Sequence, residues 1–267
     1  MVLTGLLRGG PRDASAVILV PRRQGHAVSQ LLASVRRVWL TVKALQRGTV
    51  CPVCGNRVQF AVVNTEGPRN ETLCLQCDSL ERHRRAILFL RRSTDIFTAR
   101  LRVLHVAPEA SLRRVLEGLD NLDYTTGDLL AEEVDVELDL TAIDFPDHTF
   151  DVVLCSHVLE HIPDDRRAMR EIRRVLKPDG WALINVPSDP DRAQTYEDLS
   201  IVSPEARLER FGQDDHVRVY GAVDFVARLK EAGFRVTKDP EAFSRGEIRR
   251  YRLAGDAGWD HSYLCRP

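Results

Sequence analysis

The sequence predicts an α/β protein: a doubly wound, mostly parallel sheet of seven strands, preceded by a small cysteine-bearing unit. Two observations carry this prediction. From residue 101 onward, short β-rich runs alternate with helical stretches, an order typical of a parallel sheet with helices on both faces. Before that point, four cysteines gather within residues 51–77. A chain of 267 residues is long enough to bury a core in one large domain with a smaller appendage.

The elements follow from hydrophobic pattern and turn residues. Strands are expected at 102–106, 122–126, 134–138, 151–155, 181–186, 234–238 and 261–265. Helices are expected near 110–118, 165–176 and 222–232, and a further helix after the last of the four cysteines, with Ser79 as its N-cap. The stretch 188–221 is longer than the sheet requires and is expected to be an insertion.

Composition excludes several classes of protein. Hydrophobic residues make up 43% and charged residues 29% of the chain, which is typical of a globular protein and not of a disordered one. No apolar run approaches the roughly 18–20 residues of a transmembrane helix. Nothing near the start has the pattern of a secretory signal, so we expect a cytoplasmic protein in a reducing compartment.

The overall balance of 38 basic and 39 acidic side chains hides a basic beginning. Residues 1–50 carry eight lysines and arginines against the single acid Asp13. We expect a flexible basic leader over 1–27 and an amphipathic helix over 28–46, the latter belonging to an N-terminal unit that extends to residue 93. This basic end has three candidate partners: nucleic acid, an anionic membrane surface, or the acidic remainder of its own chain.

The four cysteines form two CxxC knuckles, Cys51–Cys54 and Cys74–Cys77, separated by 19 residues. A two-residue spacer lets both thiolates of a knuckle reach one metal ion, and two knuckles complete the tetrahedral S₄ shell that suits zinc. Four protein ligands close the shell, so the predicted zinc is structural. Four unmetallated buried cysteines and a redox CxxC pair are the alternatives. Cys155 and Cys265 are expected to be buried apolar thiols.

Three stretches carry a family resemblance. They read HVAPEA at 105–110, FDVVLCSHVLEH at 150–161 and RVLKPDGW at 174–181. Together they resemble the class I S-adenosylmethionine-dependent methyltransferases, in the branch whose fourth strand leads into SHVLEH and whose fifth follows RVLKPGG. The resemblance covers residues 100–267. It implies a Rossmann-like methyltransferase sheet and S-adenosylmethionine as cofactor, with residues 188–221 covering the acceptor.

In an open α/β sheet a ligand lies outside the carboxyl ends of the strands. The resemblance places Asp128 on the ribose hydroxyls, Asp139 on the adenine amino group and Leu140 against the adenine ring. The first loop departs from the family because it has no glycine between His105 and Ser111. Glu109 is expected to bind the cofactor's ammonium group, with Ala107 small enough for close approach. The remaining residues predicted to bind the cofactor are His105, Leu129, Ser156 and His157.

Acceptor and catalytic residues are expected on two segments. His157 and His216 are candidate bases, since a neutral imidazole is available near pH 7. His216, Arg218 and Tyr220 alternate and, if extended, project to one face. Arg218, Tyr220 and Glu160 are catalytic candidates together with these two histidines. His157, Glu160 and His161 match the HxxEH protease motif, but they follow a strand instead of lying on a helix, and a divalent metal held by these three is a further alternative.

These observations favour methyl transfer to an oxygen or nitrogen of a small molecule, sugar or short peptide. An RNA methyltransferase is the alternative, with the zinc unit and the basic helix around Arg82, Arg84 and Arg85 holding RNA. Aromatic residues are only 6% of the chain, and no stripe suited to stacking bases is apparent. A non-catalytic, zinc-dependent binding module is the third hypothesis. The sequence predicts no oligomeric state.

Overall fold

The structure is a computed structural model that describes residues 49–64, 70–189, 191–238, 242–253 and 260–267. All of these residues belong to one compact unit. The expected leader over 1–27 and the expected helix over 28–46 lie outside the described residues. Among the described residues, no helix is long and apolar enough to cross a bilayer.

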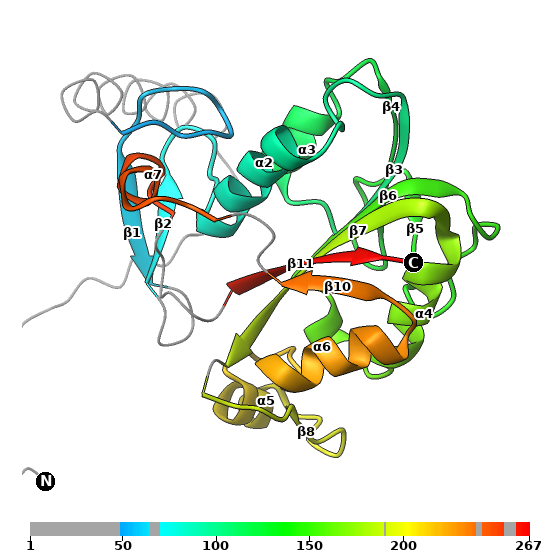
Figure 1. The fold of residues 1–267 in the computed structure, drawn as a ribbon. Coiled ribbons are helices and arrows are strands. Elements are labelled where there is room, and N and C mark those ends of the chain that lie inside the picture. Colours follow the sequence, from blue (N-terminus) through cyan, green and yellow to red (C-terminus); the bar gives the residue numbers. More distant parts are fainter. Residues whose placement is uncertain (1–48, 65–69, 190, 239–241, 254–259) are drawn as a thin grey trace, which may run out of the picture. The chain divides into compact units, whose positions relative to one another are not determined.

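The central sheet is α/β and mostly parallel, as predicted (Figure 1). Its seven main strands lie in the order β10-β11-β7-β6-β3-β4-β5, and β11 is antiparallel to both of its neighbours. Their bounds are β3 Leu101–Val106, β4 Leu122–Asp128, β5 Val136–Glu137, β6 Phe150–Ser156, β7 Leu176–Asp189, β10 Arg235–Lys238 and β11 Asp260–Arg266. The predicted Rossmann-like arrangement of seven strands is therefore confirmed.

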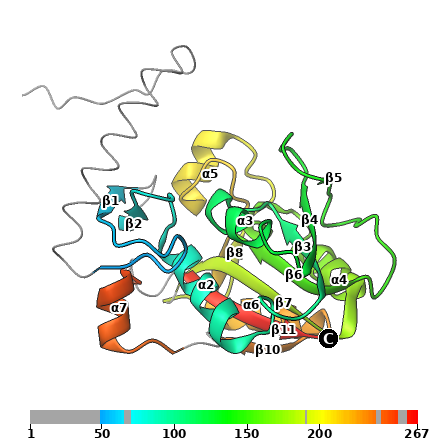
Figure 2. The same cartoon turned by 90° about the horizontal axis from the view of Figure 1, so that it is seen from above.

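Helices cover both faces of this sheet (Figures 1 and 2). On one face lie α4 (Asp165–Val175) and α6 (Ala222–Glu231), which share a core with Val153, Ile184 and Val186 of the sheet. On the other lie α3 (Ala110–Leu116) and α2 (Glu81–Ser93), which share a core with Val103, Leu154 and Leu183. This split follows from the pleat, because neighbouring residues of a strand point to opposite faces.

The cysteine-bearing unit is continuous with that second core. Cys51, Val53 and Val58 pack in the same buried cluster as residues of β3, β6 and β7. The unit contains the antiparallel pair β1 (Phe60–Asn64) and β2 (Asn70–Cys74), and it leads directly into α2. Apolar contacts across α2 therefore join the predicted metal unit to the sheet.

A late segment of the chain also joins this unit. The helix α7 (Arg245–Tyr251) lies beside the β1–β2 pair (Figures 1 and 2), and Val50 N–H donates to the Arg250 carbonyl at 3.1 Å. The side chain of Arg84, fully buried on α2, donates to the backbone carbonyls of Thr72, Tyr251 and Arg252. A buried guanidinium needs such acceptors, so Arg84 ties the second knuckle to α7.

The insertion holds three elements that the sequence pattern did not indicate. They are β8 (Tyr196–Glu197), α5 (Pro204–Phe211) and β9 (Arg218–Gly221), with β9 pairing with both β8 and the end of β7. Ser203 caps α5 by accepting from Ala206 N–H, and Gly212 ends it at φ +85°. A short 3₁₀ helix, η1 (Leu159–His161), follows β6.

One local prediction was wrong. The helix α2 begins at Glu81 with Leu80 at its N-cap position, so Ser79 does not cap it. The Ser79 hydroxyl lies instead 3.2 Å from Cys51 Sγ and 3.3 Å from Cys77 Sγ. The Ser79 hydroxyl is thus engaged by the cysteine cluster, where it accepts from the Cys77 thiol, and is not directed to the helix end.

Candidate functional site

The four cysteines of the two knuckles converge in the structure. Their sulfur atoms all lie within 4.8 Å of one another, and Cys51 Sγ is 3.7 Å from Cys77 Sγ. Four thiolates placed tetrahedrally about 2.3 Å from a zinc ion lie roughly 3.8 Å apart. No cysteine of the chain forms a disulfide, and Cys51, Cys74 and Cys77 are buried. The cluster therefore suits a closed, tetrahedral metal site.

The other two cysteines are buried away from this cluster. Cys155 on β6 is 1% exposed and Cys265 on β11 is fully buried. Burial in apolar surroundings raises the pKa of both thiols. They are therefore inert core residues, as predicted.

A second group of polar residues gathers at the carboxyl ends of β3, β4, β6 and β7. The strands are adjacent and parallel, so their ends meet at one edge of the sheet. Ser156 ends β6 and pairs in register with Asn185 of β7. Asn185 Oδ1 is buried and makes no hydrogen bond within the described part of the chain, while the buried Ser156 hydroxyl interacts with Glu109 and helps to lower the pKa of that carboxyl group. A buried polar atom without a partner in the described chain, such as Asn185 Oδ1, is a candidate contact for water or a ligand.

The first loop keeps a glycine-like backbone without a glycine. Ala107, directly after β3, has φ +45°, and its N–H donates to the Gly127 carbonyl at 2.8 Å. A residue with a Cβ adopts this left-handed conformation at a cost of about 1–2 kcal/mol. The loop therefore contains a left-handed residue, a conformation that glycine adopts without this cost.

Replacing Ala107 by glycine is accordingly expected to stabilise the protein. Glycine removes the clash of Cβ with the following carbonyl, and part of that gain is lost to the greater freedom of the unfolded chain. We expect a rise of about 1 kcal/mol in the free energy of unfolding, which corresponds to roughly 2–4 °C in Tm. Thermal unfolding followed by circular dichroism measures this. A Tm below that of the wild type would show that the left-handed backbone carries no strain.

Glu109 lies in a chain of hydrogen bonds that begins at this loop. His105 Nε2 is 3.0 Å from Glu109 Oε2, and His105 Nδ1 is 2.7 Å from the Tyr124 hydroxyl. Burial would raise the pKa of Glu109, but the hydrogen bond and charge of His105, together with His83, lower it well below the ordinary value. Glu109 is thus an anion at the edge of the sheet, as binding an ammonium group requires.

The α2 helix also reaches this carboxylate. His83 Nε2 is 3.7 Å from Glu109 Oε1, while His83 Nδ1 accepts from Leu80 N–H at 3.2 Å and lies 3.0 Å from Ser111 Oγ. Burial lowers the pKa of His83 to about 4, so the ring is neutral at pH 7. Sequence reasoning missed His83 and Tyr124 because neither lies in a family motif. Only the packing of α2 and β4 against the first loop brings them there.

The residues predicted to bind the nucleoside lie after β4 and β5. Asp128 Oδ1 accepts from the N–H groups of Leu130 and Ala131 at 2.7 and 2.9 Å, which leaves Oδ2 available. Asp139 Oδ1 accepts from both N–H and hydroxyl of Thr141, contacts that lower its pKa. Leu129 is 55% exposed. These placements are compatible with the predicted roles, which stay predictions.

Leu140 lies elsewhere. Its side chain is 3% exposed and packs in the core cluster beneath α4. It therefore offers little surface to an adenine ring in this structure.

The predicted catalytic residues are brought together around η1. His157, at φ +54°, points Nδ1 to within 3.4 Å of Glu160 Oε1, and Glu160 is 1% exposed. His216, at 4% exposed, lies against the ring of His161 with 4.7 Å between centroids. The HxxEH protease alternative requires both histidines on one face of a helix, and His157 lies outside η1.

Arg218 and Tyr220 point toward the protein interior. Arg218 is 1% exposed and donates to the carbonyls of Leu159 and Pro163 at 2.9 and 2.8 Å. The Tyr220 hydroxyl donates to Asp165 Oδ2 at 2.7 Å. Arg228 completes this buried network by pairing with Asp165 and Glu197. These contacts hold the insertion onto η1 and α4, and the direct acceptor role suggested for Arg218 and Tyr220 stays a prediction.

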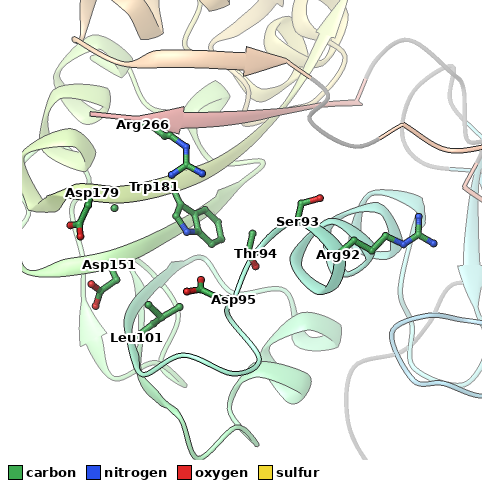
Figure 3. A pocket seen from close by; sticks show the side chains of 10 residues that line it. Arg92, Ser93, Thr94, Asp95, Leu101, Asp151, Asp179, Trp181 and Arg266 are labelled. Carbon is green, nitrogen blue, oxygen red and sulfur yellow. The ribbon is translucent and has the colours of Figure 1, made fainter.

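A separate pocket of about 500 Å³ lies at the opposite edge of the sheet (Figure 3). Leu101 begins β3, Asp151 lies at the start of β6, and Arg266 ends the antiparallel strand β11, so this pocket is at the amino ends of the parallel strands. Figure 3 shows Asp179 and Trp181 on the same wall as Arg266. In this fold class ligands bind at the carboxyl edge, so the pocket is distinct from the candidate site.

The fold is thus that of a doubly wound α/β protein, with a candidate polar site at the carboxyl ends of its strands. A model of the methyltransferase domain family matches residues 47–239. The chain therefore belongs to the methyltransferase domain family, within the class of S-adenosylmethionine-dependent methyltransferases. The match begins before the first knuckle.

Several known proteins are similar to this chain. A ubiquinone biosynthesis O-methyltransferase from Paracidovorax citrulli is 27% identical over 55% of this chain and 60% of its own length. A reducing polyketide synthase from Aspergillus oryzae is 38% identical over 30% of this chain and 3% of its own length. The chain thus spans less than two thirds of either relative. An S-adenosylmethionine dependent methyltransferase structure from Mesorhizobium loti is 16% identical, with a TM-score of 0.47 over 64% of this chain and 93% of that one.

Proposed function

We propose that this protein transfers a methyl group from S-adenosylmethionine to an oxygen or nitrogen of a small molecule, sugar or short peptide. The observation that carries the proposal is the polar edge itself. Glu109, Asp128 and the buried pair Ser156 and Asn185 lie at the ends of adjacent parallel strands. The Glu109 anion, the Asp128 carboxylate with an available oxygen, the Ser156 hydroxyl and the unsatisfied Asn185 Oδ1 suit the ammonium group and hydroxyls of this cofactor.

In the proposed reaction, each residue of this edge has a separate role. Glu109, held ionised by His105, binds the ammonium group, and Asp128 accepts from the ribose hydroxyls. The cofactor supplies an activated methyl group that is ready for displacement. His157, oriented by Glu160 at 3.4 Å, takes the proton of the acceptor. The buried network of Arg218, Tyr220 and Asp165 positions the insertion that covers the acceptor.

We further propose that the four-cysteine cluster holds a structural zinc ion. The 3.7 Å separation of Cys51 and Cys77 and the burial of both sulfurs support it. The ion would stabilise the unit that brings α2 and His83 against the first loop. It would have no open position for a substrate.

The basic helix α2 does not favour RNA as acceptor. Arg84 is buried, Arg85 and Arg91 donate to the carbonyls of Leu253 and Pro52, and Arg92 pairs with Glu247 at 2.7 Å. Guanidinium groups engaged in this way are poor contacts for phosphate, since phosphate would have to displace them. The ubiquinone relatives' names, which state O-methylation, support a small-molecule oxygen as acceptor.

Two measurements test this function. Calorimetry with the zinc-loaded protein should show one site for S-adenosylmethionine and for its demethylated product. A panel of phenols, sugars and short peptides, read out by formation of the demethylated product, should then show turnover with at least one acceptor class. Absence of cofactor binding would support the non-catalytic binding module instead. RNA binding that falls steeply with salt would support the RNA methyltransferase.

A further inference from the structure

Three potential metal ligands meet outside the cysteine cluster. One carboxylate oxygen of Glu160 and one ring nitrogen each of His161 and His216 lie within 4.8 Å of one another. Glu160 is 1% exposed and His216 is 4% exposed, so both groups are held in a low-dielectric interior. Burying a carboxylate there is costly. His157 Nδ1, 3.4 Å from Glu160 Oε1, offsets part of this cost, and a metal ion would offset more.

The backbone fixes this group in place. Val217 N–H donates to the Glu160 carbonyl at 3.0 Å, which sets His216 directly against η1. The Arg218 guanidinium, buried beside it, donates to the carbonyls of Leu159, Ile162 and Pro163 on either side of Glu160 and His161. Two segments more than fifty residues apart are thus joined by four hydrogen bonds. Ligands held this firmly are suited to bind an ion without rearrangement.

The orientation of the rings agrees with metal binding. His161 Nδ1 lies 3.3 Å from Asp215 Oδ2, so its Nε2 is the nitrogen available to an ion. Ligating histidines commonly donate their other ring N–H to a carboxylate in this way. The rings of His161 and His216 stand at 85° to each other with centroids 4.7 Å apart, so they do not stack face to face. Sequence alone grouped His157 with Glu160 and His161, whereas in the structure the third potential ligand beside Glu160 and His161 is His216 from the insertion.

We propose that Glu160, His161 and His216 form a binding site for one divalent cation such as Mn²⁺. Two histidines and one carboxylate form a set used for first-row transition ions, and it leaves coordination positions open. The use of this ion rests on the proposed function. An acceptor hydroxyl bound at an open coordination position would have a lowered pKa. His157 would accept the proton of this hydroxyl and release it to solvent, while the methyl group passes from the sulfonium sulfur of the cofactor to the acceptor oxygen. An acceptor with two neighbouring oxygen atoms would suit such a site best.

The test uses the full chain with its cysteine site loaded with zinc. Mn²⁺ is the probe because it prefers oxygen and nitrogen ligands and binds thiolates weakly, so it leaves the cysteine cluster undisturbed. We expect electron paramagnetic resonance and calorimetry to show one Mn²⁺ per chain, with pulsed spectra showing coupling to imidazole nitrogen. Glu160→Gln and His216→Ala should each weaken Mn²⁺ binding by about 100-fold or more, and Asp215→Asn by roughly 10-fold.

The matched control is Asp214→Asn, which changes the neighbouring exposed acid and should leave Mn²⁺ affinity unchanged. If His216→Ala fails to fold, His161→Gln carries the same prediction at a side chain that is 32% exposed. Absence of Mn²⁺ binding by the wild type, or equal affinity in Glu160→Gln and wild type, would overturn the proposal. Cofactor binding measured on the same samples separates this outcome from failure of the proposed methyl transfer.

Discussion

If the cysteine cluster holds the proposed zinc, replacing Cys74 by serine is expected to release this ion and to lower the Tm by about 10 °C or more. A serine hydroxyl is a poor zinc ligand, and the remaining three thiols, of which Cys51 and Cys77 are buried, would be left without their ion. Cys51, Cys74 and Cys77 share one buried cluster with Val103, Leu154 and Leu183 of the sheet. Loss of the metal should therefore destabilise the second face of the sheet as well as the knuckles.

Metal content by mass spectrometry and thermal unfolding by calorimetry measure this effect. Wild-type protein should contain one tightly held zinc and Cys74→Ser none, when both are prepared without added metal. The control is Cys155→Ala, a buried thiol outside the cluster, which should keep its zinc and lose only about 1–2 kcal/mol of stability. A wild-type protein that contains no zinc and keeps its Tm in the presence of a chelator would contradict the structural metal site.

Replacing Asp128 by alanine is expected to weaken binding of S-adenosylmethionine by about 100-fold. Two hydrogen bonds from ribose hydroxyls to a charged carboxylate contribute roughly 3 kcal/mol together, and each 1.4 kcal/mol corresponds to a factor of ten. Alanine also removes the contacts to Leu130 and Ala131 N–H that shape this loop. Asp128→Asn keeps an oxygen for that turn but loses the charge, so it should weaken binding by about 10-fold.

Calorimetry with S-adenosylmethionine distinguishes these cases. The matched control is Asp123→Ala, on the same strand but near its amino end, where Asp123 pairs with Arg102 on the surface at 3.1 Å. It should leave cofactor affinity unchanged. Equal affinities for Asp128→Ala and Asp123→Ala would remove Asp128 from the cofactor site.

The sheet could be predicted because its signal is local. Each of the seven predicted strands overlaps an observed one, since a buried strand shows as a short apolar run between turn residues. The three predicted helices of the sheet domain likewise overlap α3, α4 and α6. The insertion was harder. Its strands β8 and β9 are two and four residues long, too short to show a periodic pattern.

The alternation of His216, Arg218 and Tyr220 shows where a local pattern stops being informative. The three residues do lie near η1, yet Arg218 and Tyr220 turn their polar groups to Leu159 and Asp165. Alternate spacing in an extended segment predicts that the side chains share a face. It does not predict which neighbouring element packs against that face. Contacts between segments distant in sequence decide this.

The sequence by itself determined the α/β class, the methyltransferase resemblance and the pairing of the two CxxC knuckles, because short-range spacing and motif residues carry each of these. Only the tertiary structure decided that α2 brings His83 to within 3.7 Å of Glu109, and that His216 joins Glu160 and His161. The physical reason is the same in both cases. A buried polar group is placed by whichever partner the packing of distant elements provides, and such packing leaves no mark on local sequence.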